Sequence, residues 1–180
     1  MNQMVACFDL ETSNLDPMWG VLLCSDTKPW MGQHTTFVHC LEDGYDDCEV
    51  VEATVAELSQ YKILIAHNGV FFDRKFLNGR ALYHHLPLLD PKMKIVDPWR
   101  LAKNHLNFKG NSLDRIAEFL GTRESKSKVE GEIWMKAVYN RDYDALDYIV
   151  RHCIKDVDVL EEVADRLSPF MGNITPWGSA

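Results

Sequence analysis

The order of strand-like and helix-like segments is the feature that most constrains how this chain of 180 residues can fold. Three strand-like segments come first and are separated by turn-rich stretches. Helices and short strands then alternate along the rest of the chain. A meander followed by such alternation predicts an α/β domain with a partly parallel sheet. We expect strands near residues 3–10, 19–25, 35–40, 62–66 and 94–97, and helices near residues 50–60, 71–85, 113–120 and 142–167.

The composition is that of an ordinary globular domain, with 46% hydrophobic and 26% charged residues. No linker-like stretch divides the chain, so we expect one domain over residues 1–168 and a tail over residues 169–180. The N-terminus lacks a basic region followed by a long apolar stretch, which predicts a cytoplasmic protein with no signal peptide and no membrane partner. The five cysteines form no CxxC pair, which favours reduced thiols over disulfides or a zinc site.

The net charge of −8 argues at first sight against a partner as acidic as nucleic acid. The charge is unevenly distributed, however, because residues 92–128 contain nine Lys and Arg against four Asp and Glu. This segment is suited to phosphate contact, although a solvated surface of mixed charge explains it equally well. Divalent cations bound to an acidic cluster would also offset part of the negative charge.

Four acidic residues lie among apolar neighbours, where an unpaired carboxylate is costly to bury. Two of them, Asp9 and Glu11, end the first predicted strand and share one of its faces, because residues two apart point the same way. A divalent cation that binds both would reduce their mutual repulsion. A surface turn with solvated acids is the alternative interpretation of this pair.

The third acid, Asp156, falls within the apolar stripe of the last predicted helix and is therefore expected to face the core. His152 lies one turn earlier on nearly the same face, so the two side chains can converge on one point. Taken alone, His152 is readily interpreted as an ordinary buried histidine. Its neighbour Asp156 makes a functional role more attractive.

The fourth acid, Asp73, follows the strand KILIA and the turn HNG, and helical spacing places it on an inward face with Phe76 and Leu77. An acid in the first turn of a helix is also favoured by the helix dipole. Asn68, just before the helix, suits a turn or cap as well as a functional site. A divalent metal site is the simplest common reason for all four carboxylates.

Together these segments resemble the DEDD family of 3′–5′ exonucleases, the DnaQ-like group. Three ordered motifs carry the resemblance: FDLET at residues 8–12, HNGVFFD at residues 67–73 and HCIKDV at residues 152–157. The segments SLDRIAEFLG and KIVDPWRLA also look like connecting segments of this family. The resemblance implies the RNase H-like fold, a mixed sheet of three antiparallel and then two parallel strands, flanked by helices.

The resemblance also implies hydrolysis of phosphodiester bonds from a 3′ end, with two divalent metal ions, Mg²⁺ or Mn²⁺, and release of nucleoside monophosphates. Asp9 would bridge the two ions, Glu11 and Asp156 would complete one site, and Asp73 would support the second. His152 would orient or deprotonate the attacking water.

The third motif departs from both common subfamilies. One has Tyr four residues before the last Asp and the other has His five residues before it, whereas this chain has His152 at the tyrosine spacing. Tyr148 lies two helical turns from Asp156 and is not expected to replace His152. Three interpretations of His152 stay open: a substitute for Tyr, a general base, or a sign of an impaired enzyme.

The resemblance further implies contacts to the substrate. Thr12 and Leu15 would touch the terminal nucleotide, and Asn68 and Phe72 would hold the next sugar or base. Ordinary turn and core roles are the alternatives for these four residues. The expected partner is single-stranded nucleic acid, with DNA favoured over RNA, and a replication or repair protein is a candidate second partner.

Three residues outside the motifs are candidates to line the approach of a strand: Trp134 by stacking, and Lys126 and Lys128 by phosphate contact. A buried Trp and solvated lysines explain them equally well. The tail around Trp177 is expected to pack on its own domain rather than serve as a docking peptide. Two other functions remain open, an exoribonuclease of the same fold and a binding module without catalysis. The four carboxylates argue against the second.

Overall fold

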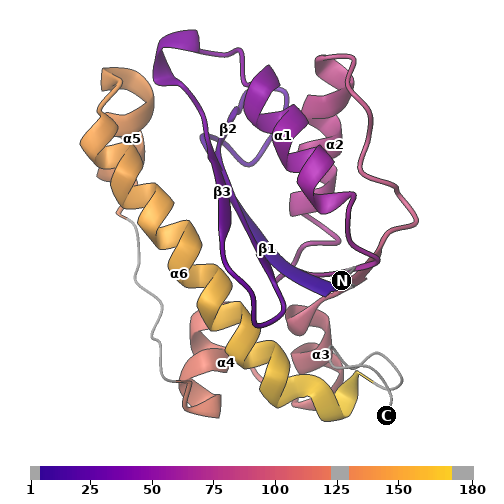
Figure 1. The fold of residues 1–180 in the computed structure, drawn as a ribbon. Coiled ribbons are helices and arrows are strands. Elements are labelled where there is room, and N and C mark those ends of the chain that lie inside the picture. The colour runs from indigo at the N-terminus through magenta and orange to yellow at the C-terminus, as the bar shows by residue number, and fades with distance from the viewer. Residues whose placement is uncertain (1–4, 123–129, 172–180) are drawn as a thin grey trace.

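The first strand, β1 (Val5–Thr12), has apolar residues on both faces and lies at the centre of a five-stranded sheet. Val5 and Cys7 face one hydrophobic cluster, whereas Ala6 and Phe8 face another. Helices therefore cover both faces of the sheet (Figure 1). The structure is a computed structural model, and it describes residues 5–122 and 130–171.

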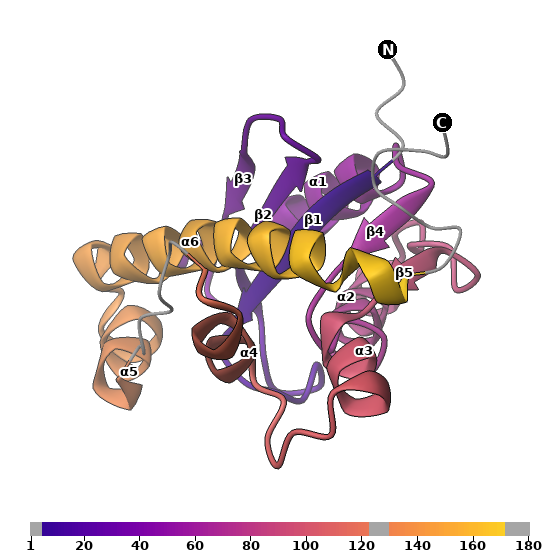
Figure 2. The ribbon, with the colours of Figure 1, turned by 90° about the horizontal axis from the view of Figure 1, so that it is seen from below.

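The sheet is mixed, with the strand order β3-β2-β1-β4-β5 (Figure 2). Strands β2 and β3 continue from β1 as an antiparallel meander, whereas β4 pairs parallel with β1 and β5 pairs parallel with β4. This arrangement confirms the predicted fold class. The other four strands are β2 (Leu22–Pro29), β3 (Thr35–Val38), β4 (Ile63–Ile65) and β5 (Lys94–Val96).

The helices form two layers. Helices α1 (Cys48–Leu58) and α2 (Asp73–Tyr83) pack on the face that carries Phe8. The long helix α6 (Tyr143–Leu167) crosses the opposite face, where Figure 2 shows it running over the strands. Shorter helices accompany α6, and two 3₁₀ turns complete the described elements: α3 (Pro98–His105), α4 (Leu113–Leu120), α5 (Gly131–Asn140), η1 (Leu41–Asp43) and η2 (Ser168–Phe170).

The ends of two helices follow the local signals in the sequence. Asp142 caps α6, because its side chain accepts a hydrogen bond of 3.0 Å from the backbone N of Ala145. Helix α4 ends at Gly121, which has the left-handed conformation favoured by glycine. Ser112 occupies the N-cap of α4, but its side chain makes no capping hydrogen bond. Apart from the second strand, every predicted element has ends within two residues of the prediction.

The second strand exists, but its predicted bounds are wrong, because the sequence places a turn where β2 continues to Pro29. The carboxylate of Asp26 is fully buried in this strand, accepts a hydrogen bond of 2.7 Å from Thr36 Oγ1, and lies 2.6 Å from His34 Nδ1. Pairing with β1 and β3 satisfies the backbone. Long-range pairing therefore overrides the turn tendency of the segment SDTKP.

Helices α3 and α5 are absent from the sequence-based prediction. The start of α3 nevertheless carries a readable signal, because Asp97 is its N-cap and Pro98 follows at the first helical position. Lys126, Lys128 and Trp177, which were candidates for strand contact or docking, lie outside the described residues. No helix in the described part of the chain combines the length and apolarity needed to cross a membrane.

Candidate active site

The two acids of the first motif lie where β1 extends beyond its parallel neighbour. Pairing between β1 and β4 ends at Cys7, so Asp9 and Glu11 project from the part of β1 past the end of β4. The alternation of β1 directs both side chains toward the face crossed by α6, as the sequence predicts. The register of the β1–β2 pairing shifts between Glu11, which lies opposite Cys24, and Thr12, which lies opposite Leu22.

Three ligand-type side chains converge on the Glu11 end of this strand. His152 Nε2 lies 3.9 Å from Glu11 Oε1 and 3.6 Å from Asp156 Oδ2. Each of the three residues offers a ligand atom within 4.8 Å of the other two. Both distances exceed those of hydrogen bonds, and a cation between these atoms would draw them together. Helix α6 supplies His152 and Asp156 from consecutive turns, and both are buried.

Asp9 lies beside the same part of α6. The Cys153 Sγ atom is 3.6 Å from the backbone O of Asp9 and 3.9 Å from its Oδ2. Burial, a hydrogen bond with Cys24 and the charges of Asp9 and Glu11 raise the pKa of the Cys153 thiol well above its usual value. Cys153 therefore stays a neutral donor toward Asp9. No sequence pattern predicts this role for Cys153.

Asp73 is the first residue of α2 and is buried against β1. Burial raises the pKa of its carboxyl to about 7, and the charge of Asp97 contributes in the same direction, whereas a hydrogen bond from the backbone of Leu10 opposes it. Leu10 stands between Asp9 and Glu11, so Asp73 approaches the same stretch of β1 from the other side. A divalent cation at this point would favour the charged form of Asp73.

The turn before Asp73 is held in place by Asp97. Asn68 has a positive φ of 63°, and its backbone N donates a hydrogen bond of 2.8 Å to Asp97 Oδ1. The next residue must be small, because a Cβ on Gly69 would lie 2.3 Å from the Cβ of Ala66. The sequence analysis did not predict this structural role of Asp97. Its Asp-Pro start signal could have revealed the cap, but not the contact with Asn68.

Three of the four predicted substrate residues line one hollow beside the acids. Thr12, Leu15 and Phe72 share this pocket of about 280 Å³ with Glu11 and Trp134. Asn68, the fourth predicted residue, does not line it. The hollow therefore brings Trp134 of α5 to the end of β1, although the two segments are distant in the sequence. The substrate roles of all these residues remain predictions.

Two aromatic rings, the exposed Phe71 and the partly buried Trp99, form a second surface with nearby cationic groups beside the HNG turn, which we call the aromatic–basic surface. Phe71 and Trp99 meet edge to face with ring centroids 6.1 Å apart. Lys75 Nζ lies 5.6 Å from the Phe71 ring, and Lys103 Nζ lies 4.6 Å from the Trp99 ring. Arg100 also lies 6.0 Å from the Phe71 ring. Such interleaving suits bases and phosphates.

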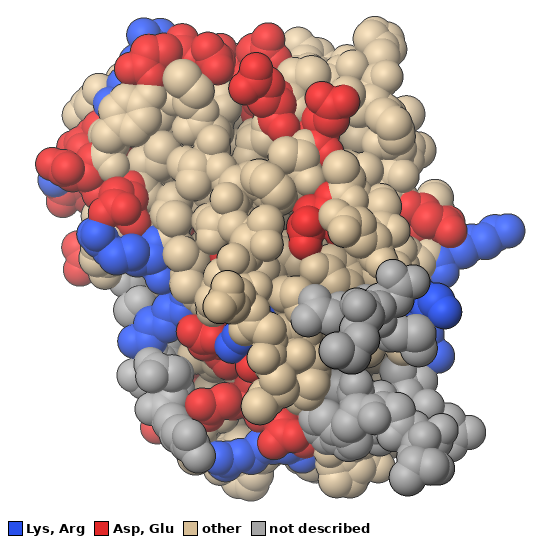
Figure 3. Space-filling view, in the orientation of Figure 1, with Lys and Arg blue, Asp and Glu red and all other residues tan. Residues whose placement is uncertain are grey.

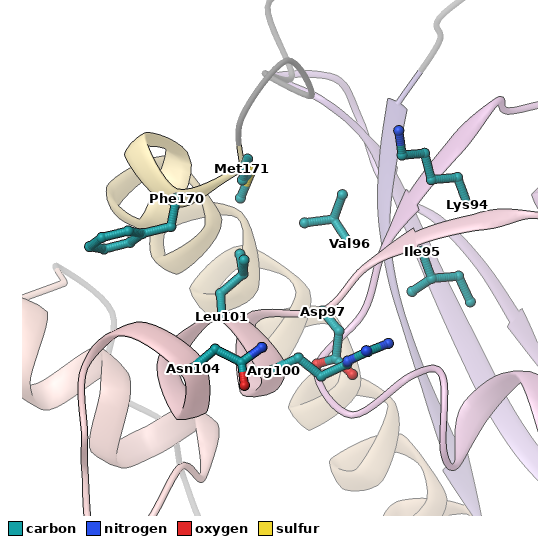
Figure 4. A pocket seen from close by; sticks show the side chains of 9 residues that line it. All are labelled: Lys94, Ile95, Val96, Asp97, Arg100, Leu101, Asn104, Phe170 and Met171. Atoms are coloured by element: carbon teal, nitrogen blue, oxygen red, sulfur yellow. The ribbon is translucent and has the colours of Figure 1, made fainter.

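A further pocket, of about 240 Å³, lies between β5, α3 and the end of η2 (Figure 4). Figure 4 shows Asp97 and Arg100 close together at one side, with Phe170 and Met171 at another. None of the acids of β1 or α6 lines this pocket. It is separate from the candidate active site, which is the surface around Glu11, His152 and Asp156. Asp97 lines this pocket and also holds the turn before Asp73.

The central strand of the mixed sheet carries two acids, and the helix that crosses the sheet carries a third acid. This arrangement defines an RNase H-like protein. In agreement, the family model of the RNase H superfamily matches residues 6–168, and the chain belongs to this superfamily. This confirms the predicted fold, and the membership supports a nuclease-type hydrolase.

Among solved structures, the chain is similar to a family B DNA polymerase from the hyperthermophilic archaeon Pyrobaculum calidifontis. The TM-score is 0.76 at 22% sequence identity, and the match covers 92% of this chain. It covers 24% of the polymerase, so this chain spans about a quarter of that protein's length. No curated protein matches the sequence.

Proposed function

We propose that this protein is a metal-dependent 3′–5′ exonuclease of the DEDD type that acts on single-stranded DNA or frayed 3′ ends. The observation that carries the proposal is the convergence of Glu11, His152 and Asp156 beside Asp9. Membership of the RNase H superfamily supports the coarser assignment to nucleases. Direction of attack and preference for DNA are parts of the proposal that the experiment below addresses.

The donor set suits hard divalent cations. Asp9, Glu11, Asp73 and Asp156 offer carboxylate oxygens, which Mg²⁺ and Mn²⁺ prefer over nitrogen or sulfur. These four acids would hold two such ions. When bound, such ions activate a water molecule and stabilise charge on the leaving oxygen.

His152 is placed to handle the proton of the attacking water. Its Nε2 faces Glu11 Oε1 at 3.9 Å and Asp156 Oδ2 at 3.6 Å, so a water held by those carboxylates would lie within reach of the ring. An imidazole exchanges protons near neutral pH. We therefore assign His152 as the general base, at the spacing where part of the family has Tyr.

Substrate contact is assigned to two surfaces. In the hollow, Thr12 and Leu15 would contact the terminal nucleotide, and Phe72 together with Asn68 would hold the next sugar or base. The aromatic–basic surface would receive the following bases and phosphates, because stacking on aromatic rings tolerates any base sequence. A local surface of this kind would allow an acidic protein to bind nucleic acid.

The test is degradation of a single-stranded oligonucleotide labelled at its 5′ end, with Mg²⁺ or Mn²⁺. We expect a ladder of products that shortens stepwise, no cleavage of circular single-stranded DNA, and loss of activity in Asp9→Ala. Glu118→Ala, which removes an exposed acid of α4, is the matched control and should remain active. An oligonucleotide that stays intact with both metals would refute the proposed exonuclease activity. Parallel DNA and RNA substrates would decide between the proposal and an exoribonuclease.

A further inference from the structure

Among the described residues, a second group of metal-ligating side chains lies away from the candidate active site. Asp46, Cys48 and His84 each offer a ligand atom within 4.8 Å of the others. His84 directly follows α2, whereas Asp73 begins this helix of 11 residues. His84 and Asp73 are therefore separated by the length of α2, about 16 Å at 1.5 Å per residue.

A buried carboxylate fixes the orientation of His84. Its Nε2 lies 2.5 Å from Asp47 Oδ1, while Asp47 also accepts hydrogen bonds from Arg80 Nη2 at 2.7 Å and from the backbone N of Leu22 at 2.7 Å. Because the Arg80 guanidinium is bonded to the same carboxylate, Asp47 acts as the acceptor in its contact with His84, and Nε2 donates the ring proton.

The other ring nitrogen of His84, Nδ1, then carries a lone pair that it can donate to a metal ion. His84 Nδ1 points toward Asp46, with 3.8 Å between Nδ1 and Asp46 Oδ1. The same Asp46 oxygen accepts a hydrogen bond of 3.2 Å from the backbone N of Cys48, which fixes the short loop before α1. A carboxylate that holds one histidine nitrogen while the other faces a metal is a recurrent arrangement around zinc.

The donor types distinguish this site from the candidate active site. One sulfur, one imidazole nitrogen and one carboxylate oxygen form a set that favours Zn²⁺ over Mg²⁺ or Mn²⁺. Charge favours a cation as well, because residues 29–61 contain seven Asp and Glu and no Lys or Arg. Figure 3 shows acidic side chains along the upper edge of this face, where Figure 1 places η1 and the start of α1.

We propose that Asp46, Cys48 and His84 bind one Zn²⁺ ion, with Asp47 as the residue that positions His84. The ion would join the start of α1 to the end of α2, and a water molecule would complete its coordination. This site is independent of the proposed nuclease function. Its ligands come from two segments of the chain, which is why the absence of a CxxC pair in the sequence does not exclude it.

Binding of Co²⁺, a spectroscopic substitute for Zn²⁺, provides the test. The full chain would carry Asp9→Ala and Asp156→Ala, so that the candidate active site does not contribute. We expect one equivalent of Co²⁺ to produce a thiolate-to-cobalt charge-transfer band that Zn²⁺ abolishes and Mg²⁺ leaves unchanged. Cys48→Ser should abolish the band. Cys40→Ser, which changes an exposed cysteine of the same acidic region, should retain it.

A second measurement covers the case in which Cys48→Ser does not fold. Asp46 is exposed, so Asp46→Asn should fold normally and weaken Zn²⁺ binding about 10-fold or more in calorimetry. Zn²⁺ should also raise the melting temperature of the parent chain more than that of Asp46→Asn. The proposal is overturned if no band forms, if the band survives Cys48→Ser, or if Asp46→Asn binds Zn²⁺ as tightly as the parent.

Discussion

The carboxylate of Asp97 fixes the backbone of Asn68, 29 residues away, through a hydrogen bond of 2.8 Å from the backbone N. The same oxygen accepts a hydrogen bond of 3.0 Å from the backbone N of Trp99 and so caps α3. One side chain therefore joins the turn before Asp73 to the helix that carries part of the aromatic–basic surface. This connection makes Asp97 a positioning residue for the candidate active site.

Replacing Asp97 with Ala should reduce stability and nuclease activity together. Loss of the cap and of the bond to Asn68 is expected to lower the free energy of unfolding by about 1–3 kcal/mol. Asp97→Asn keeps a side-chain oxygen and should cost less. Ser112→Ala is the matched control, because Ser112 is an N-cap whose side chain makes no capping hydrogen bond. Urea unfolding measures the difference, and equal losses in the Asp97→Ala and Ser112→Ala variants would contradict the role of Asp97.

The raised pKa of Asp73 predicts a dependence of stability on pH. The folded-state pKa of about 7 exceeds the unfolded value of about 3.9. Between these values the folded protein binds more protons than the unfolded chain, so stability falls as the pH rises from about 4 to 7. Urea unfolding, with a chelator present, should show that the free energy of unfolding falls more between pH 5 and pH 8 in the wild type than in Asp73→Asn.

Divalent cations should oppose that loss. Mg²⁺ beside Asp73 favours the charged carboxylate, so stability at pH 8 should rise with Mg²⁺ in the wild type and rise less in Asp73→Asn. An unchanged pH dependence in Asp73→Asn would show that another group is responsible.

His152 should be required for turnover. Removal of a general base typically lowers the rate by about 10²–10⁴-fold, and we expect a loss in this range for His152→Ala. Wild-type activity should fall at acid pH, because a protonated imidazole cannot act as a base. Tyr148→Phe, which changes an exposed residue one turn earlier on α6, should have the wild-type rate and pH profile. Full activity in His152→Ala would remove the general-base role.

His152→Tyr distinguishes the remaining interpretations. Substantial activity in this variant would indicate that the position, which has the tyrosine spacing of the family, matters more than proton transfer by imidazole. If His152 acts as the base, we expect His152→Tyr to lose the wild-type pH profile even where some activity remains.

The aromatic–basic surface should contribute to binding rather than to the chemical step. Phe71→Ala removes a half-exposed ring, and base stacking on such rings contributes about 1–3 kcal/mol. We expect weaker binding of a single-stranded oligonucleotide to Phe71→Ala in fluorescence anisotropy, measured in an Asp9→Ala background to prevent hydrolysis. Phe119→Ala, on the exposed side of α4, is the control. Equal affinities in the two variants would place the strand elsewhere.

Local periodicity was sufficient to predict most of the fold. Helix α6 follows from an apolar stripe with helical spacing, and β1 follows from a strand-like apolar run that a turn-rich stretch ends; the two-residue repeat of a strand then assigns Asp9 and Glu11 to one face. These patterns are visible because side-chain direction repeats within each element. The same regularity predicted that His152 and Asp156 share a face of one helix.

The tertiary structure decided what periodicity does not contain. Strand β2 continues through a turn-like segment, because pairing with β1 and β3 and the buried Asp26 stabilise it. The distance of 3.9 Å between Glu11 Oε1 and His152 Nε2 depends on how α6 crosses the sheet, since the two residues are far apart in sequence. Asp97 and His84 likewise acquire their roles only through packing. The sequence by itself determined which residue types each element presents to the core, whereas packing of the elements determined which of those residues meet.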